Sequence, residues 1–217
     1  EVNFITVTVD QNMKGTGPDE VKLAARVTRA FLGVRIDCVQ CHDDHLGDDF
    51  LQKDFHQLAS FFAGADMALS GVRETDKTYE FKYRRQRKPM EVEPTVPFQG
   101  ELLPEDGRPR DRLAQWITHS ENRAFARATV NRIWALMFGR PLVEPVDEIP
   151  LQDSLENPYP PGLELLVDDF IIHKFDLQRL IRVIAATRVF RLDSKVPAGH
   201  PPPTLKQEQH WASFALS

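Results

Sequence analysis

The N-terminal region is organised around the stretch Asp37-Cys38-Val39-Gln40-Cys41-His42, which follows a segment of helical periodicity and precedes an acidic turn. Two cysteines three residues apart, with a histidine directly after the second, form the signature of covalent haem attachment. The spacing lets each thiol reach one vinyl group of the same porphyrin, and the histidine places an imidazole nitrogen on the iron. We therefore expect one covalent haem c, attached at Cys38 and Cys41 and ligated by His42.

Two other readings of this cysteine pair are open. A redox dithiol or disulfide of the thioredoxin type needs a strand before the pair and a helix after it, whereas the preceding segment here is helical. The pair could instead be half of a zinc site. A structural zinc ion needs four ligands, however, and the sequence holds no second Cys or His pair with zinc spacing. The dithiol interpretation lacks the preceding strand, and the zinc interpretation lacks a second pair of ligands; a haem site needs neither.

Helices are expected on both sides of the motif. The first runs from Pro18 to Val34, with proline suited to its first turn and Asp19 and Glu20 complementing the helix dipole. The second runs from Gln52 to Ala63 and stops near Gly64. Apolar residues recur at helical spacing in both segments.

The rest of the chain changes from strand to helix. Alternation over Thr78–Tyr83 predicts a short strand, and prolines follow it up to residue 109. Helices are expected near 110–119, 123–138, 162–173 and 176–187. The predicted fold class is mostly α: a small helical c-type haem unit and a helical bundle, joined by a strand-containing connector. The expected regions are 1–69 for the haem unit, 70–109 for the connector, 110–192 for the helical domain and 193–217 for an extended tail.

A six-coordinate iron would need a second axial ligand from elsewhere in the chain. His56 is the first candidate, because the second helix can fold back over the open haem face. Met67, after that helix in a segment rich in Gly and Ala, is the runner-up. His45 is only three residues from His42 and would struggle to reach the opposite face. Five-coordinate iron is also open.

Composition excludes several partner classes. The chain has 217 residues, a formal net charge of -5 and a pI near 5.8, so it lacks the basic footprint of a nucleic-acid-binding protein. No apolar run approaches the roughly 20 residues that span a bilayer. With two cysteines the chain can form only one disulfide, which argues against a disulfide-stapled fold.

The sequence also resembles a known family. The stretches Phe31 to Asp43, Asp54-Phe55 and Phe61-Phe62-Ala63 are similar to the planctomycete-type cytochrome c domain of unknown function. Further stretches are similar to the helical domain that usually follows it: Arg110 to Ile117, Phe125-Ala126-Arg127, Val130 to Trp134, Phe138-Gly139-Arg140 and Leu163 to Phe170. The family usually reads Cys-His-Asp-His-Pro, whereas this chain reads Cys41-His42-Asp43-Asp44-His45-Leu46. The resemblance implies an exported monohaem protein and names no reaction.

The expected function is one-electron transfer by an exported module in the periplasm or outside the cell, with a redox partner protein or a larger assembly. Two alternatives remain. The chain could be an enzyme whose five-coordinate haem acts on peroxide or another small ligand, or a structural haem subunit of a larger assembly. The sequence has no nucleophile elbow, phosphate loop or zinc-peptidase helix, so hydrolase chemistry has no support.

Overall fold

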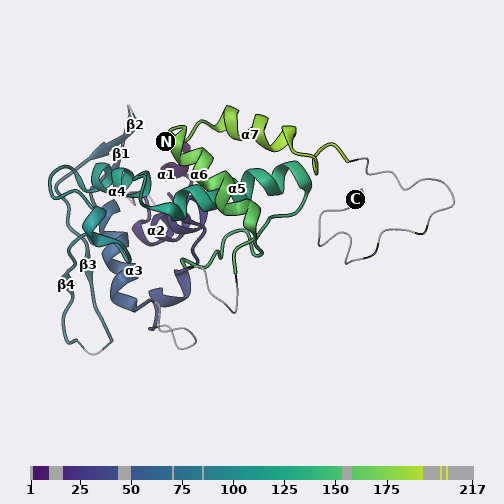
Figure 1. The fold of residues 1–217 in the computed structure, drawn as a ribbon. Helices are drawn as coiled ribbons and strands as arrows, with labels where there is room; N and C mark the ends of the chain where they lie inside the picture. Colours follow the sequence, from purple (N-terminus) through teal and green to yellow (C-terminus); the bar gives the residue numbers. More distant parts are fainter. Residues whose placement is uncertain are drawn as a thin grey trace. The chain divides into compact units, whose positions relative to one another are not determined.

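The protein is described by a computed structural model (Figure 1). It describes residues 2–9, 17–43, 50–69, 71–84, 86–152 and 158–192, together with Pro201 and Thr204. Seven α-helices and two small antiparallel sheets of two strands each lie within these residues, which confirms the predicted mostly α fold class. The chain divides into two compact units. The first holds Glu1–Phe125 and Asp147–Leu151, and the second holds Ala126–Val146 and Gln152–Ser217.

The first unit contains most of the regular structure. Its helices are α1 (Val2–Thr6), α2 (Glu20–Val27), α3 (Gln52–Ala59) and α4 (Pro109–Ile117), with 3-10 turns η2 (Asp37–Gln40), η3 (Ser60–Phe62) and η4 (Gly100–Leu102). Its strands are β1 (Ala65–Ala68), β2 (Gly71–Glu74), β3 (Glu80–Phe81) and β4 (Met90–Glu91). The first turn of α5 (Arg123–Phe138) also belongs to it.

The helix expected before the motif is present, but its last turn is wider than an α-helix. Asp19 caps α2 by accepting a hydrogen bond from the Lys22 backbone. The chain then continues as a π-helical turn, η1 (Thr28–Leu32), and ends at Gly33 with a φ of 63°. Such a left-handed end suits glycine, which has no Cβ to clash. Cys38, the first residue of the motif, therefore lies five residues after Gly33.

The second predicted helix is confirmed as α3 followed by η3. It packs against α2, and its apolar face carries Phe55, which is fully buried. Phe61 in η3 and Trp116 in α4 are also fully buried in the same core. Trp116 donates its indole N–H to the Gln99 carbonyl at 3.2 Å, so the large ring is buried without losing its polar partner. The core thus holds α2, α3 and α4 behind the motif.

The connector contains more strand than the sequence indicated. The expected strand at Thr78–Tyr83 is found as the shorter β3, which pairs with β4. The hairpin of β1 and β2 was not predicted; its register pairs Ala65 with Glu74 and Ala68 with Gly71. The pairing continues one residue beyond the strands, because Thr75 donates its backbone N–H to the Gly64 carbonyl at 2.8 Å.

The second unit is helical, as predicted. It comprises most of α5 and the helices α6 (Pro161–Ile172) and α7 (Leu177–Ala186), which pack against each other. Asn131 of α5 is fully buried and clamps the following loop. Its amide donates to the Val143 carbonyl at 2.8 Å, and its side-chain oxygen accepts from the Val143 N–H at 2.9 Å. Gly139 follows α5 with a φ of 75°, a left-handed conformation that suits glycine.

The compact units and the expected regions divide the chain at different points. The helical domain was expected from residue 110, whereas the division falls after Phe125, inside α5. The connector and α4 therefore belong to the first unit. None of the described helices is long and apolar enough to cross a membrane.

Candidate functional site

The Cys38–His42 motif lies on a 3-10 turn at the surface of the first unit. Side chains at i and i+3 of a 3-10 helix align, so Cys38 in η2 and Cys41 at its C-cap lie on one face. Both cysteines are exposed, and they are not joined in a disulfide. Between them, Val39 is only 2% exposed and anchors the turn in the core. The turn therefore exposes both thiols on one face, while the buried Val39 side chain holds its opposite face in the core.

His42 follows the turn and is exposed. Its Nδ1 lies 2.8 Å from the carbonyl oxygen of Asp43. A carbonyl can only accept, so this contact requires a proton on Nδ1. The neutral ring then carries its lone pair on Nε2, which is the arrangement of a histidine that binds a metal through Nε2.

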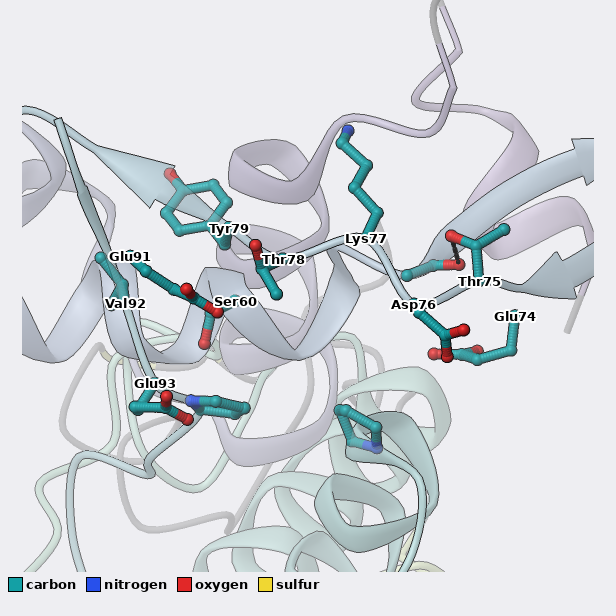
Figure 2. A pocket seen from close by; sticks show the side chains of 13 residues that line it. Ser60, Glu74, Thr75, Asp76, Lys77, Thr78, Tyr79, Glu91, Val92 and Glu93 are labelled. Atoms are coloured by element: carbon teal, nitrogen blue, oxygen red, sulfur yellow. Dashed lines mark hydrogen bonds between the residues drawn. The ribbon is translucent and has the colours of Figure 1, made fainter.

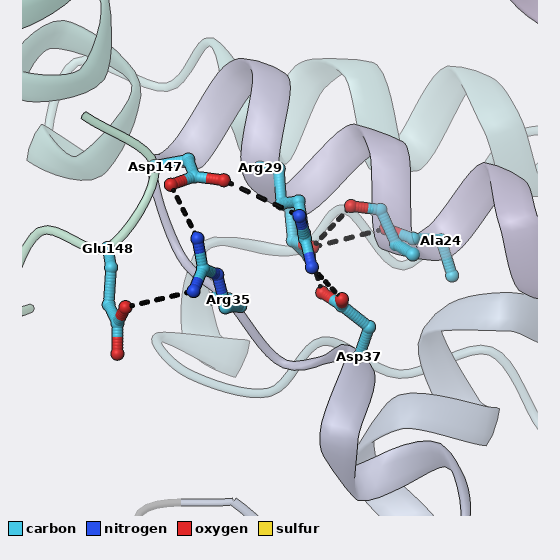
Figure 3. A network of polar contacts seen from close by, with 8 residues as sticks. Ala24, Arg29, Arg35, Asp37, Asp147 and Glu148 are labelled. Atoms are coloured by element: carbon cyan, nitrogen blue, oxygen red, sulfur yellow. Dashed lines mark hydrogen bonds and ion pairs between the residues drawn. The ribbon is translucent and has the colours of Figure 1, made fainter. Parts of the chain in front are cut away.

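Ion pairs hold the start of the turn (Figure 3). Arg29 of η1 forms an ion pair with Asp37, and its Nε lies 2.9 Å from the Asp37 carboxylate. A second guanidinium nitrogen of Arg29 lies 3.6 Å from Asp147, which also accepts from Arg35 at 3.0 Å. Arg35 reaches Glu148 as well, at 3.4 Å. Asp37 directly precedes Cys38, so this network holds the chain in place just before the first cysteine of the motif.

The charges of the network change the titration of Asp37. Partial burial raises the pKa of Asp37, but the hydrogen bond from Arg29, a local backbone hydrogen bond and the charges of Arg29 and Arg35 together bring it below its usual value. The hydrogen bond to Asp37 likewise raises the pKa of Arg29, although burial opposes it. Asp37 is therefore an anion at neutral pH, and the pair persists there.

Hydrogen bonds from α3 hold the end of the turn. The backbone carbonyl of Gln40 accepts from the side-chain amide of Gln52 at 3.1 Å and contacts Nε2 of His56 at 3.0 Å. The backbone N–H of Gln52 donates to the Asp43 carboxylate at 2.9 Å. Gln40 directly precedes Cys41, so the first turn of α3 fixes the backbone beside the second cysteine.

His56 itself is only 2% exposed, although it is polar. Its Nδ1 lies 2.9 Å from the hydroxyl oxygen of Tyr79, and its ring stacks on Phe81 with centroids 3.3 Å apart. Burial lowers the pKa of His56, although the hydrogen bond to Gln40 opposes the shift. Burial, with the charges of Glu20, Tyr83 and Asp19, raises the pKa of Tyr79 to about 12. His56 is therefore neutral at pH 7 and Tyr79 keeps its proton.

The other candidate ligands lie elsewhere. Met67 was placed in a loop from its sequence, but it lies in β1, paired with Val72 and 37% exposed. His45 lies outside the described residues. Where the structure describes the chain, no three His, Cys, Asp or Glu side chains gather as a metal-binding group.

A groove of about 300 Å³ lies on the first unit (Figure 2). Residues of η3, β2, β4 and the segment between β2 and β3 line it, with carboxylates from Glu74, Asp76, Glu91 and Glu93 beside Lys77. Glu74 is also bound to Arg110, whose Nε donates to it at 2.6 Å. Because five charged side chains line the groove, it does not resemble the largely apolar sites that hold large planar cofactors.

Arg127 and Asn131 lie on α5, in the second unit. The structure gives them internal partners. Arg127 donates to Glu164 at 2.8 Å and 3.2 Å and lies over the ring of Tyr159, while Asn131 holds the loop at Val143. These contacts stabilise the second unit.

Two known families match separate stretches of the chain. Residues 3–67 match the family model described as PSCyt2, a protein of unknown function (DUF1549). Residues 109–213 match the family model described as PSD1, a protein of unknown function (DUF1553). Over these two stretches the chain is similar to the domain pair typical of planctomycete proteins. The PSCyt2 match covers the motif and α3, and the PSD1 match begins at α4. No curated protein and no solved structure is significantly similar to the chain.

Proposed function

We propose that this PSCyt2–PSD1 chain is an exported monohaem c-type cytochrome module for one-electron transfer. The observation that carries the proposal is the geometry of the Cys38–His42 turn. Both thiols are exposed, unbridged and on one face of a 3-10 turn, and His42 follows directly. This donor set fits a covalently attached haem.

Each residue of the turn has a part in this function. Each thiol adds across one vinyl group, with sulfur bonding to one vinyl carbon and the proton going to the other, so attachment consumes no oxidant. His42 offers Nε2 as the proximal ligand, because its Nδ1 donates to the Asp43 carbonyl. A haem held in this way supplies reversible one-electron chemistry at its iron. Val39, Asp37 and Gln40 keep the turn in place through burial, ion pairing and hydrogen bonding.

Location and partners follow from the attachment chemistry. Attachment of haem c is normally completed outside the cytoplasm, so the mature module belongs in the periplasm or outside the cell. A one-electron carrier needs a donor and an acceptor, which are redox proteins or members of a larger assembly. A mature, haem-loaded chain in the cytoplasm would contradict the export part of the proposal.

The test is to produce the full chain together with a c-type maturation system. We expect one haem per chain by intact mass, and the porphyrin should stay with the denatured protein through extraction with acidified solvent. The variants Cys38→Ala and Cys41→Ala should each lose one of the two bonds, and the double variant should release all of the porphyrin. A colourless chain with two free or bridged thiols would show that the proposal is wrong.

A second candidate function is supported by the surroundings of His56. Both of its ring nitrogens contact protein groups, Gln40 and Tyr79, so neither is offered to an iron. A haem with no internal sixth ligand binds small molecules, and the module would then act on peroxide or a similar ligand. Ligand-sensitive spectra in both oxidation states would favour this enzyme over the electron carrier.

A further inference from the structure

We propose that His56 is a positioning residue for the Cys38–His42 turn and not an iron ligand. Its hydrogen bond to the Gln40 carbonyl holds the backbone beside Cys41, and the Tyr79 hydroxyl satisfies the other ring nitrogen. The positioning role of His56 is inferred from the hydrogen bonds of the chain and does not depend on the proposed function. The part that concerns iron ligation rests on the proposed function.

The hydrogen-bond partners determine where the protons are. The Gln40 carbonyl can only accept, so Nε2 of His56 carries a proton and donates it over 3.0 Å. In a neutral ring, Nδ1 is then an acceptor, and the Tyr79 hydroxyl donates to it over 2.9 Å. Every polar atom of the ring is satisfied by this one tautomer. A buried imidazole with two matched partners is costly to move.

Packing opposes any movement of the ring toward the cysteines. His56 is 2% exposed, whereas Cys38, Cys41 and His42 are exposed. Phe81 covers one face of the ring, with the centroids 3.3 Å apart. Ligation of an iron at the exposed motif would break the bond to Gln40 and expose a ring that α3 and β3 now enclose. His56 therefore acts on the motif from its buried side.

Glutamine is the variant that separates the two roles. Its amide N–H can donate to Gln40 and its amide oxygen can accept from Tyr79, but it cannot replace an imidazole on iron. His56→Gln should therefore keep the turn in place. His56→Leu has a similar size but removes both hydrogen bonds. Tyr79→Phe is the matched control, since it removes the hydroxyl and leaves the bond from His56 to Gln40.

The first measurement uses the full chain without haem. Nitrogen-15 NMR should show a neutral His56 with its proton on Nε2, and the Val39 and Gln40 amides should be protected from hydrogen exchange. His56→Leu should speed that exchange about fivefold, as expected for the loss of one buried hydrogen bond, while His56→Gln and Tyr79→Phe stay within about twofold of wild type. A proton on Nδ1, or equal acceleration in His56→Leu and Tyr79→Phe, would overturn the positioning role.

The second measurement uses the same chains made with the maturation system. His56→Gln should keep the wild-type haem yield and the same iron spin state, and His56→Leu should give a lower yield. A change from low-spin to high-spin iron in His56→Gln would identify His56 as a ligand and overturn the proposal. If even the wild-type chain takes up no haem, the proposed function fails, and the exchange measurement alone decides the positioning role.

Discussion

Gln40 and Asp37 show how a short exposed motif is held without being buried. Asp37 is bound through its carboxylate by Arg29, and Gln40 is bound through its carbonyl by Gln52 and His56. The residues that make these contacts lie 8 to 16 positions away in the sequence. The cysteines themselves therefore stay exposed while the backbone on each side of them is fixed.

The lowered pKa of His56 predicts a pH dependence of stability. The unfolded chain has an ordinary histidine pKa near 6.5, and the folded value lies below it. The contribution of His56 is therefore fully present above about pH 6.5 and is lost as the pH falls from there toward the folded pKa, because the unfolded chain takes up the proton more readily. Urea unfolding of the full chain should show this loss. His56→Gln should unfold with a weaker dependence over the same range, and an identical dependence in both proteins would contradict the shift.

Gly64 predicts a second effect at a single position. A Cβ at this residue would lie 2.5 Å from the backbone oxygen of Thr75 and 2.8 Å from the Glu74 carboxylate. Gly64→Ala should therefore destabilise the first unit by about 1–3 kcal/mol, the usual cost of overpacking, measured by thermal or urea unfolding. Gly100→Ala is the control, because its Cβ would meet nothing within 4 Å. Equal stability of the two variants would show that the chain at Gly64 lies less close to Glu74 and Thr75 than described.

Helices were the most predictable elements, because their periodicity and caps are local. The helix at 123–138 has the bounds that the sequence indicated, and α7 lies within the expected 176–187, with Asp176 as its N-cap. The hairpin of β1 and β2 was missed because its strands have only four residues each, too few for a clear alternation. The π-helical turn η1 was missed because one wider turn leaves the apolar pattern of a helix almost unchanged.

In the candidate site, too, the residues set by local sequence were predictable and the contacts between distant residues were not. The cysteines and His42 are recognised from five consecutive residues, so the sequence was sufficient for them. The partners of His56 were not predictable, since Tyr79 lies 23 residues away and reaches the ring only through the fold of the connector. From sequence alone, a histidine beside the apolar face of a predicted helix is equally consistent with a buried core residue and with an iron ligand. Their difference appears only when both ring nitrogens have partners.

The connector predicts the first sites of limited proteolysis. The turn between β3 and β4 is exposed from Gln86 to Met90, and it carries basic residues that trypsin recognises. Dilute trypsin should cut the folded chain first between about Arg84 and Arg108, because exposed loops are cleaved before packed helices. N-terminal sequencing of the first fragments checks this. First cleavage within α5 would instead place that helix at an open surface.

The first unit is discontinuous in sequence. Asp147–Leu151 belongs to it, although these residues fall within the PSD1 match, and Ile149 donates its backbone N–H to Gly33 at 2.7 Å. Asp147 meets both Arg29 and Arg35 beside that bond. The segment that supports the start of the motif is therefore encoded more than 100 residues after it.

Asp147 predicts how strongly this distant segment stabilises the first unit. Asp147→Asn should lower the free energy of unfolding by about 1 kcal/mol, since both ion pairs are partly solvent-exposed. High salt should reduce the difference from wild type. Glu148→Gln is the matched control, because Glu148 is 56% exposed and meets only Arg35 among the ion pairs described. An effect of Glu148→Gln as large as that of Asp147→Asn would show that the central position of Asp147 has no special importance.

The late position of Asp147–Leu151 also has a consequence for biosynthesis. A ribosome adds about 5–20 residues per second, so the 26 residues from Ala126 to Leu151 take roughly one to five seconds to make. During that interval Arg29 and Arg35 exist without their later carboxylate partners, and Gly33 lacks its bond to Ile149. The nascent chain therefore passes through a period in which the cysteine turn has been synthesised but lacks the contacts that the later segment supplies.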